Sequence, residues 1–386
     1  MKLPVYLDNN ATTPCDPLVL EAMLPWFNEK FGNAASTGHI YGWEAEEAVK
    51  IGREQVASLI GAHPQEIVFT SGATESANLA LKGVFEMYST KGNHIITLQT
   101  EHKAVLDTCQ ELEKKGAIVS YLPVNREGFI NLEELEAAIN PRTLLIAVMY
   151  ANNETGVIQP IQEIATVAKK KGVIFFTDAT QALGKIPISV IQDGIDLMAL
   201  SAHKLYGPKG VGVLYVRRKD PRVRLTAQMN GGNHERGMRS GTLNVPGIVG
   251  MGRACELAFD RLAAEAKSIA LMRDYLEESL LSTGLCIRNG PTISRLPQVT
   301  NLQFKGCLAS DLMTRLNQSI AVSSGSACSS SSPEPSHVLT SMGLSKSEAQ
   351  RSIRFSLGRF TTQEELDYAI PKILKELQLI SISRIS

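Results

Sequence analysis

Short β-rich runs alternate with segments of helical periodicity between residues 66 and 216, and this alternation constrains the fold more than any other feature. The runs are continuously apolar, as expected of strands that are buried on both faces of a sheet. The candidate strands are Glu66–Thr70, His94–Leu98, Ile118–Leu122, Leu144–Tyr150, Val173–Thr177, Asp196–Leu200 and Val211–Val216. Helical periodicity lies between several of them, as in Ser76–Met87, Lys103–Lys114 and Ile161–Lys171. This pattern predicts an α/β fold with a mainly parallel seven-stranded sheet sandwiched by helices.

The C-terminal third has a different pattern, which predicts a smaller α+β unit. A long helical stretch near Pro246–Leu281 connects it to the sheet. Its candidate strands and helices are Val299–Phe304, Ser352–Ser356, Ala309–Leu316 and Thr362–Leu377. We therefore expect a large domain over residues 14–255 and a small domain formed by residues 1–13 and 256–386. The first dozen residues would pack with the small domain or cross the active site.

Composition and charge exclude several classes of partner. The 39 basic and 39 acidic residues balance, so no overall field attracts nucleic acid or an anionic membrane. No apolar run reaches the roughly 18 residues that span a bilayer. The N-terminus lacks the apolar stretch of a signal peptide, so we expect a cytoplasmic protein. The six cysteines are widely spaced without a CxxC pair, which indicates reduced thiols rather than a zinc site or a disulfide framework.

The polar residues with the most specific pattern follow two neighbouring candidate strands. Ser201, His203 and Lys204 come after the strand at residues 196–200. Ligands bind at the carboxyl ends of parallel strands, so a lysine there points its amine into the crevice. Asp178 and Gln181 follow the strand at residues 173–177. Asp178 could cap a helix, or it could keep the pyridine nitrogen of pyridoxal phosphate (PLP) protonated.

Three further strand ends bring polar residues to the same rim. Thr74 lies in a turn before a helix, where backbone N–H groups suit a phosphate. His102 could stack on a flat cofactor and exchange protons, and Asn153 offers an amide. Each residue alone could have only a structural role. Together the five strand ends predict a PLP enzyme that carries its cofactor as a Schiff base on Lys204.

Two residues outside the sheet complete the candidate site. Cys328 lies in a run of small polar residues, about 323–335, that reads as a mobile loop. An exposed thiolate there would be a good nucleophile. Arg354 alternates with apolar neighbours on a candidate strand. It is either a solvated strand arginine or a fork that binds a substrate carboxylate.

The motifs around these residues resemble those of the cysteine desulfurases, which are PLP enzymes of the class V aminotransferase fold, fold type I. The resemblance runs from residue 6 to about residue 372. The Ser-Ser-Gly-Ser-Ala-Cys context of Cys328 is similar to the subgroup with a long, mobile cysteine loop, which supplies sulfur for iron–sulfur clusters and tRNA thiolation. The matching motifs are Tyr6-Leu7-Asp8-Asn9-Asn10-Ala11-Thr12-Thr13, Ser71-Gly72-Ala73-Thr74-Glu75-Ser76, Thr100-Glu101-His102, Asn152-Asn153-Glu154, Asp178-Ala179-Thr180-Gln181, Ser201-Ala202-His203-Lys204, Gly237-Met238-Arg239-Ser240-Gly241-Thr242 and Ser323-Ser324-Gly325-Ser326-Ala327-Cys328.

The resemblance implies a role for each matching residue. Around the cofactor ring, Lys204 would form the Schiff base, Asp178 pair with the pyridine nitrogen, Gln181 bond the phenolic oxygen, and His102 stack on the ring and aid proton transfer. The phosphate would be held by Ala73, Thr74, Ser201, His203 and, from the neighbouring subunit of a homodimer, Thr242. The substrate carboxylate would be held by Asn153 and Arg354.

The resemblance also implies the reaction and its partners. L-cysteine would become L-alanine, and its sulfur would pass to Cys328 as a persulfide for acceptor proteins of iron–sulfur assembly or tRNA thiolation. By the same analogy, Cys328 could serve as an iron ligand of a cluster. The chain ends at Ser386, soon after Phe360. Housekeeping members continue further with a tail that helps to dock the scaffold, so the resemblance leaves open whether this chain docks a scaffold in that mode.

Three other functions are compatible with this sequence. A selenocysteine lyase of the same fold would need the Cys328 thiol less, and its Cys328→Ala variant would still turn over selenocysteine. A PLP aminotransferase would need a 2-oxo acid as amino acceptor. A non-catalytic sulfur carrier would show no absorbance band of a lysine-bound cofactor, and the intact lysine, aspartate and histidine argue against it.

Overall fold

A seven-stranded sheet forms the centre of the protein. The structure is a computed structural model and describes residues 2–324 and 335–383. The strands are β2 (Ile67–Thr70), β3 (His94–Leu98), β4 (Ile118–Leu122), β5 (Thr143–Ala147), β6 (Ile174–Asp178), β7 (Leu197–Ser201) and β8 (Gly212–Val216). Their spatial order is β2-β8-β7-β6-β5-β3-β4, and β8 alone runs antiparallel to its neighbours within this sheet. The predicted mainly parallel sheet is confirmed.

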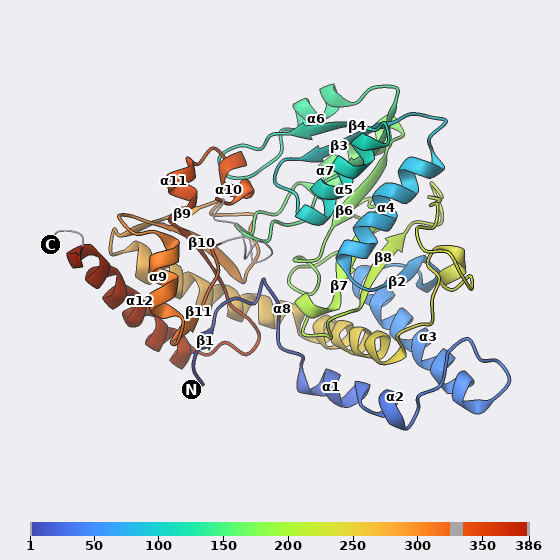
Figure 1. Cartoon of the computed structure of the whole chain (residues 1–386), viewed down its shortest axis with the longest axis horizontal. Helices are drawn as coiled ribbons and strands as arrows, with labels where there is room; N and C mark the ends of the chain where they lie inside the picture. The colour runs from blue at the N-terminus through green and yellow to red at the C-terminus, as the bar shows by residue number, and fades with distance from the viewer. Residues whose placement is uncertain (1, 325–334, 384–386) are drawn as a thin grey trace.

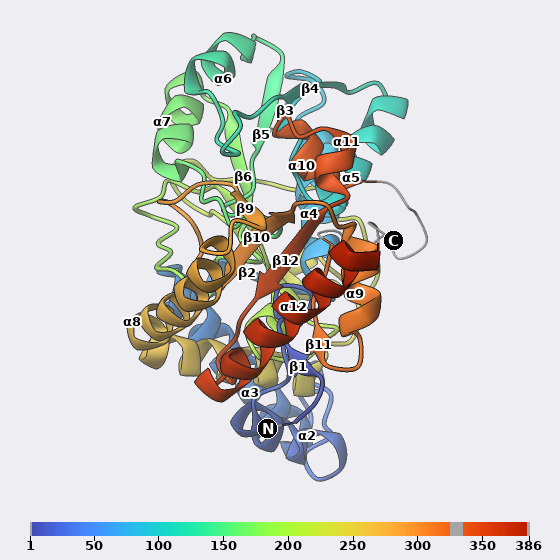
Figure 2. The ribbon, with the colours of Figure 1, turned by 90° about the vertical axis from the view of Figure 1, so that its left-hand side faces the viewer.

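Helices cover both faces of this sheet (Figures 1 and 2). Alternate residues of a strand point to opposite faces. Ile146 of β5 packs in a core with α3, α7 and the first part of α8, whereas Leu145 and Ala147 pack in a core with α4 and α5. Because both faces are buried, the strands are apolar throughout, as the sequence indicated. The helices of this part are α1 (Pro17–Met23), α2 (Pro25–Asn28), α3 (Ile40–Ile60), α4 (Ala73–Met87), α5 (Lys103–Lys114), α6 (Leu132–Ala138) and α7 (Ile161–Lys171).

The long helix α8 (Val245–Leu281) runs from the large sheet into a smaller unit. That unit has an antiparallel sheet in the order β12-β10-β9 and a two-stranded parallel pair of β1 with β11. Met251 on α8 packs in the core of the large sheet, and Leu276 packs in a separate core with α9 and α12. These two cores support the proposed division near residue 255. The elements are β1 (Val5–Tyr6), β9 (Cys286–Asn289), β10 (Val299–Phe304), α9 (Ala309–Leu316), β11 (Ile320–Ala321), α10 (His337–Ser341), α11 (Lys346–Ala349), β12 (Ser352–Ser356) and α12 (Gln363–Ser383).

The structure moves some predicted boundaries. Helix α4 begins at Ala73 rather than Ser76, because Gly72 serves as its N-cap. Strand β5 ends at Ala147 rather than Tyr150. The backbone nevertheless continues along the sheet, since the Val148 and Tyr150 N–H groups donate to carbonyls of β6. Within the described residues, no helix combines the length and the apolar character needed to cross a membrane.

Candidate active site

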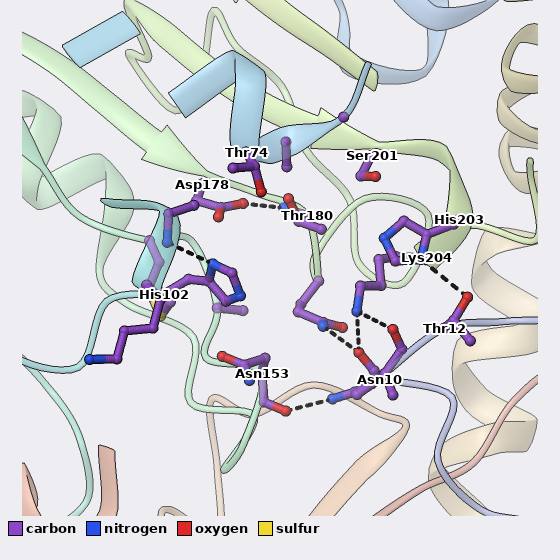
Figure 3. A pocket seen from close by; sticks show the side chains of 18 of the residues that line it. Asn10, Thr12, Thr74, His102, Asn153, Asp178, Thr180, Ser201, His203 and Lys204 are labelled. Atoms are coloured by element: carbon purple, nitrogen blue, oxygen red, sulfur yellow. Dashed lines mark hydrogen bonds between the residues drawn. The ribbon is translucent and has the colours of Figure 1, made fainter. Parts of the chain in front are cut away.

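Nearly all of the predicted site residues line one cavity of about 520 Å³ at the carboxyl edge of the large sheet (Figure 3). Its volume suits a cofactor-sized ligand. Two predicted residues are not among those that line it. Thr242 is exposed on its own chain, and Cys328 lies outside the described residues. The predicted residues that line the cavity are Ala73, Thr74, His102, Asn153, Asp178, Gln181, Ser201, His203, Lys204 and Arg354.

Lys204 reaches into the cavity from the short 3-10 turn that follows β7. Its Nζ donates to the carbonyl oxygens of Asn10 and Ala11, at 2.5 and 2.6 Å (Figure 3). Gln181 Nε2 donates to the same Asn10 carbonyl at 3.0 Å. The N-terminal segment therefore crosses the active site, which was one of the two placements expected for it.

Asn10 anchors that crossing, and it was not assigned a role from the sequence. Its backbone N–H donates to Ser356 Oγ at 2.9 Å, and its side-chain amide donates to the Asn153 carbonyl at 3.0 Å. Asn10 is 3% exposed. It joins the end of β12 to the loop that follows β5. The motif that contains Asn10 was noted, but its position depends on contacts with residues far away in the sequence.

Asp178 ends β6 and lies buried at the floor of the cavity. Its Oδ1 accepts a hydrogen bond from the Thr180 N–H at 2.9 Å, which is a local turn rather than a helix N-cap, because no helix starts here. The buried Thr180 Oγ1 has no hydrogen-bond partner within the described residues. A polar ligand in the cavity would satisfy that hydroxyl.

The turn before α4 presents backbone N–H groups to the cavity. Gly72 caps the helix without a side-chain hydrogen bond, so the helix N-terminus stays available to an anion. Gly212 of β8 lies directly behind it: a Cβ on Gly212 would come within 2.6 Å of the Gly72 Cα. Because neither glycine has a side chain, the turn can pack directly against the sheet next to Ser201.

The two predicted histidines of the cavity have different hydrogen-bond partners. His203 Nδ1 lies 3.1 Å from Thr12 Oγ1, and burial together with the charges of Lys204 and Lys209 lowers its pKa to about 4. His203 is therefore a neutral hydrogen-bonding group at ordinary pH. His102 caps α5, and its Nδ1 accepts the Ala104 N–H at 3.1 Å. A neutral His102 ring thus carries its proton on Nε2.

Arg354 lies on β12 and is 1% exposed, so the alternative of a solvated strand arginine is wrong. Its Nη2 lies 2.8 Å from Asp8 Oδ1, and its Nη1 donates to the Asn153 carbonyl at 3.2 Å. The guanidinium also lines the cavity. Asp8 and Asn153 therefore hold a positive charge at the wall of the pocket.

Four acidic or imidazole residues in or beside the cavity were assigned no role from the sequence: Glu75, Glu154 and His337 line it, and Glu101 is buried next to His102 in the chain. Glu101 is buried, and burial raises its pKa well above the usual value, while its Oε1 accepts the Met149 N–H at 2.7 Å. Glu154 and His337 line the cavity beside Arg354. Glu101 and Glu154 stood inside noted motifs, whereas His337 carried no local signal.

The donor set of this cavity fits PLP. It combines a lysine amine, a carboxylate, a helix N-terminus without a side-chain cap and a buried hydroxyl without a partner among the described residues, all at one edge of the sheet. A fold of this kind with such a site defines a PLP-dependent enzyme of fold type I.

Comparison with known proteins agrees with this class. Residues 5–369 match the family model "Aminotransferase class-V". The "Cysteine desulfurase IscS" of Anaeromyxobacter dehalogenans (strain 2CP-C) is 55% identical over 371 residues, which cover 96% of this chain and 91% of the relative. A solved "NIFS-LIKE PROTEIN" superposes with a TM-score of 0.90 at 41% identity, covering 98% of this chain and 100% of the other. "SspA in complex with cysteine" has a TM-score of 0.82 at 39% identity, with 93% and 100% covered. The chain therefore belongs to the class V aminotransferase family and, within it, to the cysteine desulfurases.

Proposed function

We propose that this protein is a cysteine desulfurase that converts L-cysteine to L-alanine and takes the sulfur on Cys328 as a persulfide. The observation that carries the proposal is the meeting of Lys204, Asp178 and Arg354 in one cavity. The lysine and aspartate suit a PLP cofactor, and the arginine suits the carboxylate of an amino acid. The similarity to a structure with bound cysteine supports the choice of substrate.

Different residues of the cavity would bind different parts of the cofactor. Bound PLP would withdraw electrons from the substrate Cα, which weakens the Cβ–S bond. Asp178 would keep the ring nitrogen protonated, Gln181 would bond the phenolic oxygen, and His102 would stack on the ring. The phosphate would lie at the N-terminus of α4, on Ala73, Thr74, Ser201 and His203.

Lys204, Asn153 and Arg354 would handle the substrate. Arg354 is already oriented by Asp8, so little side-chain freedom is lost when it binds the carboxylate. Asn153 would add an amide hydrogen bond. Lys204 Nζ would carry the proton that leaves and returns at the substrate Cα. Its two carbonyl partners, on Asn10 and Ala11, keep the amine at this spot.

The sulfur leaves on Cys328. Its thiolate would attack the substrate sulfur, so that an S–S bond forms while the Cβ–S bond breaks and its electron pair stays on carbon. Protonation then yields L-alanine and the persulfide. Proteins of iron–sulfur assembly or tRNA thiolation would accept the sulfur, and Cys328 could also ligate iron of a cluster. We place the enzyme in the cytoplasm, where thiols stay reduced; the five cysteines within the described residues form no disulfide.

We also propose a homodimer. Large apolar side chains are gathered along α1 to α3, each at least 55% exposed: Leu24, Phe27, Phe31, Ile40 and Trp43. A monomer rarely exposes such a surface. Thr242 stands shortly before α8, the helix that packs on α1 and α3. A partner on this apolar face would bring its own Thr242 toward the phosphate site.

The experiment is to add L-cysteine to the purified protein and to measure both products. We expect L-alanine by amino-acid analysis and a mass increase of one sulfur atom on the peptide that contains Cys328. The Cys328→Ala variant should keep the absorbance band of the lysine-bound cofactor but release no alanine.

Other outcomes would overturn the proposal. Sulfur on a different cysteine would refute the role of Cys328. Turnover of selenocysteine by the Cys328→Ala variant, equal to the wild type, would indicate a selenocysteine lyase. Amino transfer to a 2-oxo acid without alanine and sulfide would indicate an aminotransferase. The absence of the cofactor band would indicate a non-catalytic sulfur carrier.

A further inference from the structure

His337 lines the cavity without a role in the chemistry proposed above. It is the first residue of α10, on the small unit, whereas most of the other cavity residues follow strands of the large sheet. The residue is half-buried and lines the cavity, so part of it can meet a ligand. His337 reaches the pocket on α10, away from the strand ends that would hold the cofactor, so it is placed to contact the substrate.

The ring of His337 is held in one tautomer. His337 Nε2 lies 2.9 Å from the backbone carbonyl oxygen of Glu101. A carbonyl oxygen can only accept, so Nε2 must carry the proton. In the neutral ring the lone pair is therefore on Nδ1, which is a hydrogen-bond acceptor.

The other two imidazoles of the cavity are engaged differently. The acceptor nitrogen of His102 is used by the N–H of Ala104, where it caps α5. His203 Nδ1 lies beside the hydroxyl of Thr12. Within residues 2–324 and 335–383, no hydrogen bond to Nδ1 of His337 is formed. His337 thus offers an acceptor nitrogen to a ligand in this cavity.

The position of His337 is fixed through its neighbour. Ser336 caps α10 by accepting the Leu339 N–H, and its hydroxyl donates to Oε2 of the buried Glu154 at 2.5 Å. Burial raises the pKa of Glu154, whereas the Ser336 hydroxyl and the charges of His337, Arg354 and His102 lower it. Asn153, the neighbour of Glu154 in the chain, accepts a hydrogen bond from Arg354 Nη1 at 3.2 Å, so Ser336, Glu154 and Arg354 lie at the same end of the cavity.

The short length of L-cysteine places its thiol near His337. The proposed anchor of the carboxylate is Arg354, and in L-cysteine only two carbons separate the carboxylate carbon from the sulfur. The thiol must therefore lie close to the groups that surround Arg354. A thiol is a weak donor, and an imidazole lone pair is a suitable acceptor for it.

We propose that His337 determines specificity for the substrate thiol by accepting its S–H hydrogen bond at Nδ1, with Glu154 and Ser336 as positioning residues. This inference rests on the proposed function, because it takes L-cysteine as the substrate. No bond is made or broken in the contact itself. It distinguishes L-cysteine from its product L-alanine, which is the same molecule without the thiol.

The test compares two ligands on the same protein. In the Cys328→Ala holoenzyme, the dissociation constants of L-cysteine and L-alanine are measured from the change of the cofactor absorbance. His337→Gln keeps a donor for the Glu101 carbonyl but removes the acceptor at Nδ1. We expect His337→Gln to raise the dissociation constant of L-cysteine about fivefold, which is the effect of one ordinary hydrogen bond. The dissociation constant of L-alanine should not change. The ratio of the two constants is independent of the fraction of protein that folds.

Three more variants complete the design. His337→Asn keeps an acceptor near Nδ1 and should preserve most of the preference for L-cysteine. Ser336→Ala should shift the ratio in the direction of His337→Gln, because α10 loses its anchor on Glu154. Lys346→Gln, an exposed charge on α11, should not change the ratio.

The outcomes distinguish a failure of the role of His337 from a failure of the proposed desulfurase activity. The role of His337 is refuted if the enzyme with Cys328 intact forms alanine from cysteine, yet His337→Gln changes the dissociation constants of both ligands equally or changes neither. A preference of His337→Gln for L-cysteine equal to that of the parent has the same meaning. If the intact enzyme forms no alanine, the proposed function itself fails.

Discussion

Arg354 and Asp8 form an ion pair of 2.8 Å that joins β12 to the N-terminal segment at the wall of the active-site cavity. Arg354 is among the largest fully buried side chains of the described residues. Burial of a guanidinium requires a counter-charge, and Asp8 supplies it. The pair thus explains how a strand arginine can stay inside the protein and still face a substrate carboxylate.

The first prediction concerns this pair. Arg354→Lys should raise KM for L-cysteine on the order of tenfold or more and change kcat less, because an ammonium cannot hold a carboxylate with two parallel hydrogen bonds. Asp8→Asn keeps an acceptor for the guanidinium but removes its counter-charge, so it should lower the stability of the fold and raise KM less than Arg354→Lys does. Steady-state kinetics of alanine release measure both. An unchanged KM in a folded Arg354→Lys protein would contradict the role of Arg354.

The second prediction concerns the acid stability of the small unit. Glu277 on α8 accepts from Arg295, Arg288 and Thr300, which join the helix to the neighbouring loop, β9 and β10. Burial alone would raise its pKa, but these hydrogen bonds dominate and lower it to about 2. The unfolded chain binds this proton near the ordinary glutamate value, so the stabilisation is complete above about pH 4.5 and is lost as the pH falls toward 2.

Glu277→Gln should therefore lower the free energy of unfolding at pH 7 by about 3 kcal/mol, since it removes the counter-charge of Arg288 and leaves Arg295 with the 3.3 Å pair to Asp274. Urea denaturation at a series of pH values measures this. The gap between wild type and variant should narrow below about pH 4.5. Glu278→Gln, which changes the exposed neighbour on the same helix, should have no such effect. An equal loss in both variants, or a gap that does not depend on pH, would show that the cluster is not the cause.

The third prediction concerns the contact of Gly212 with Gly72. Gly212→Ala would place a methyl group 2.5 Å from the Leu200 carbonyl oxygen of β7 and 2.6 Å from the Gly72 Cα, so both the end of β7 and the turn before α4 must move. We expect the affinity for PLP to fall at least about tenfold, because the proposed phosphate site shifts. Cofactor release measured by absorbance tests this. Gly38→Ala, where an added Cβ meets nothing within 4 Å, is the control. Unchanged affinity in a folded Gly212→Ala protein would argue against a phosphate at this turn.

Much of this architecture could be predicted from local sequence because its causes are local. Lys204, Asp178 and Thr74 each follow an apolar strand, and parallel strands bring their carboxyl ends to one edge. The bounds of α8, β10 and β12 matched within one residue, since helical and strand periodicity continue to a clear end in each.

The missed residues depend on contacts between distant parts of the chain. Asn10 reaches the cavity through a hydrogen bond to Ser356. His337 reaches it because Ser336 binds Glu154 and its own ring binds Glu101. Helix α3 was not anticipated either: its exposed Ile40, Tyr41 and Trp43 blur the apolar stripe that marks an ordinary surface helix.

The last prediction tests the proposed homodimer and the role of Thr242 across it. Thr242→Val should weaken the cofactor site of the partner subunit, and Lys204→Ala should inactivate its own. A mixed dimer of the two variants contains one complete site, formed by Lys204 of one subunit and Thr242 of the other. Isolated through two different affinity tags, it should regain about half of the wild-type activity at limiting PLP, although each parent is impaired.

The control for this experiment combines Lys204→Ala with His203→Ala. Both residues line the cavity of their own chain, so this mixed dimer has no complete site and should stay inactive. Recovery in the first mixture but not in the second would locate Thr242 at the partner's phosphate. A stable mixed dimer of Lys204→Ala and Thr242→Val without recovery would contradict that placement, and a monomer in gel filtration would contradict the apolar face along α1 to α3 as a dimer interface.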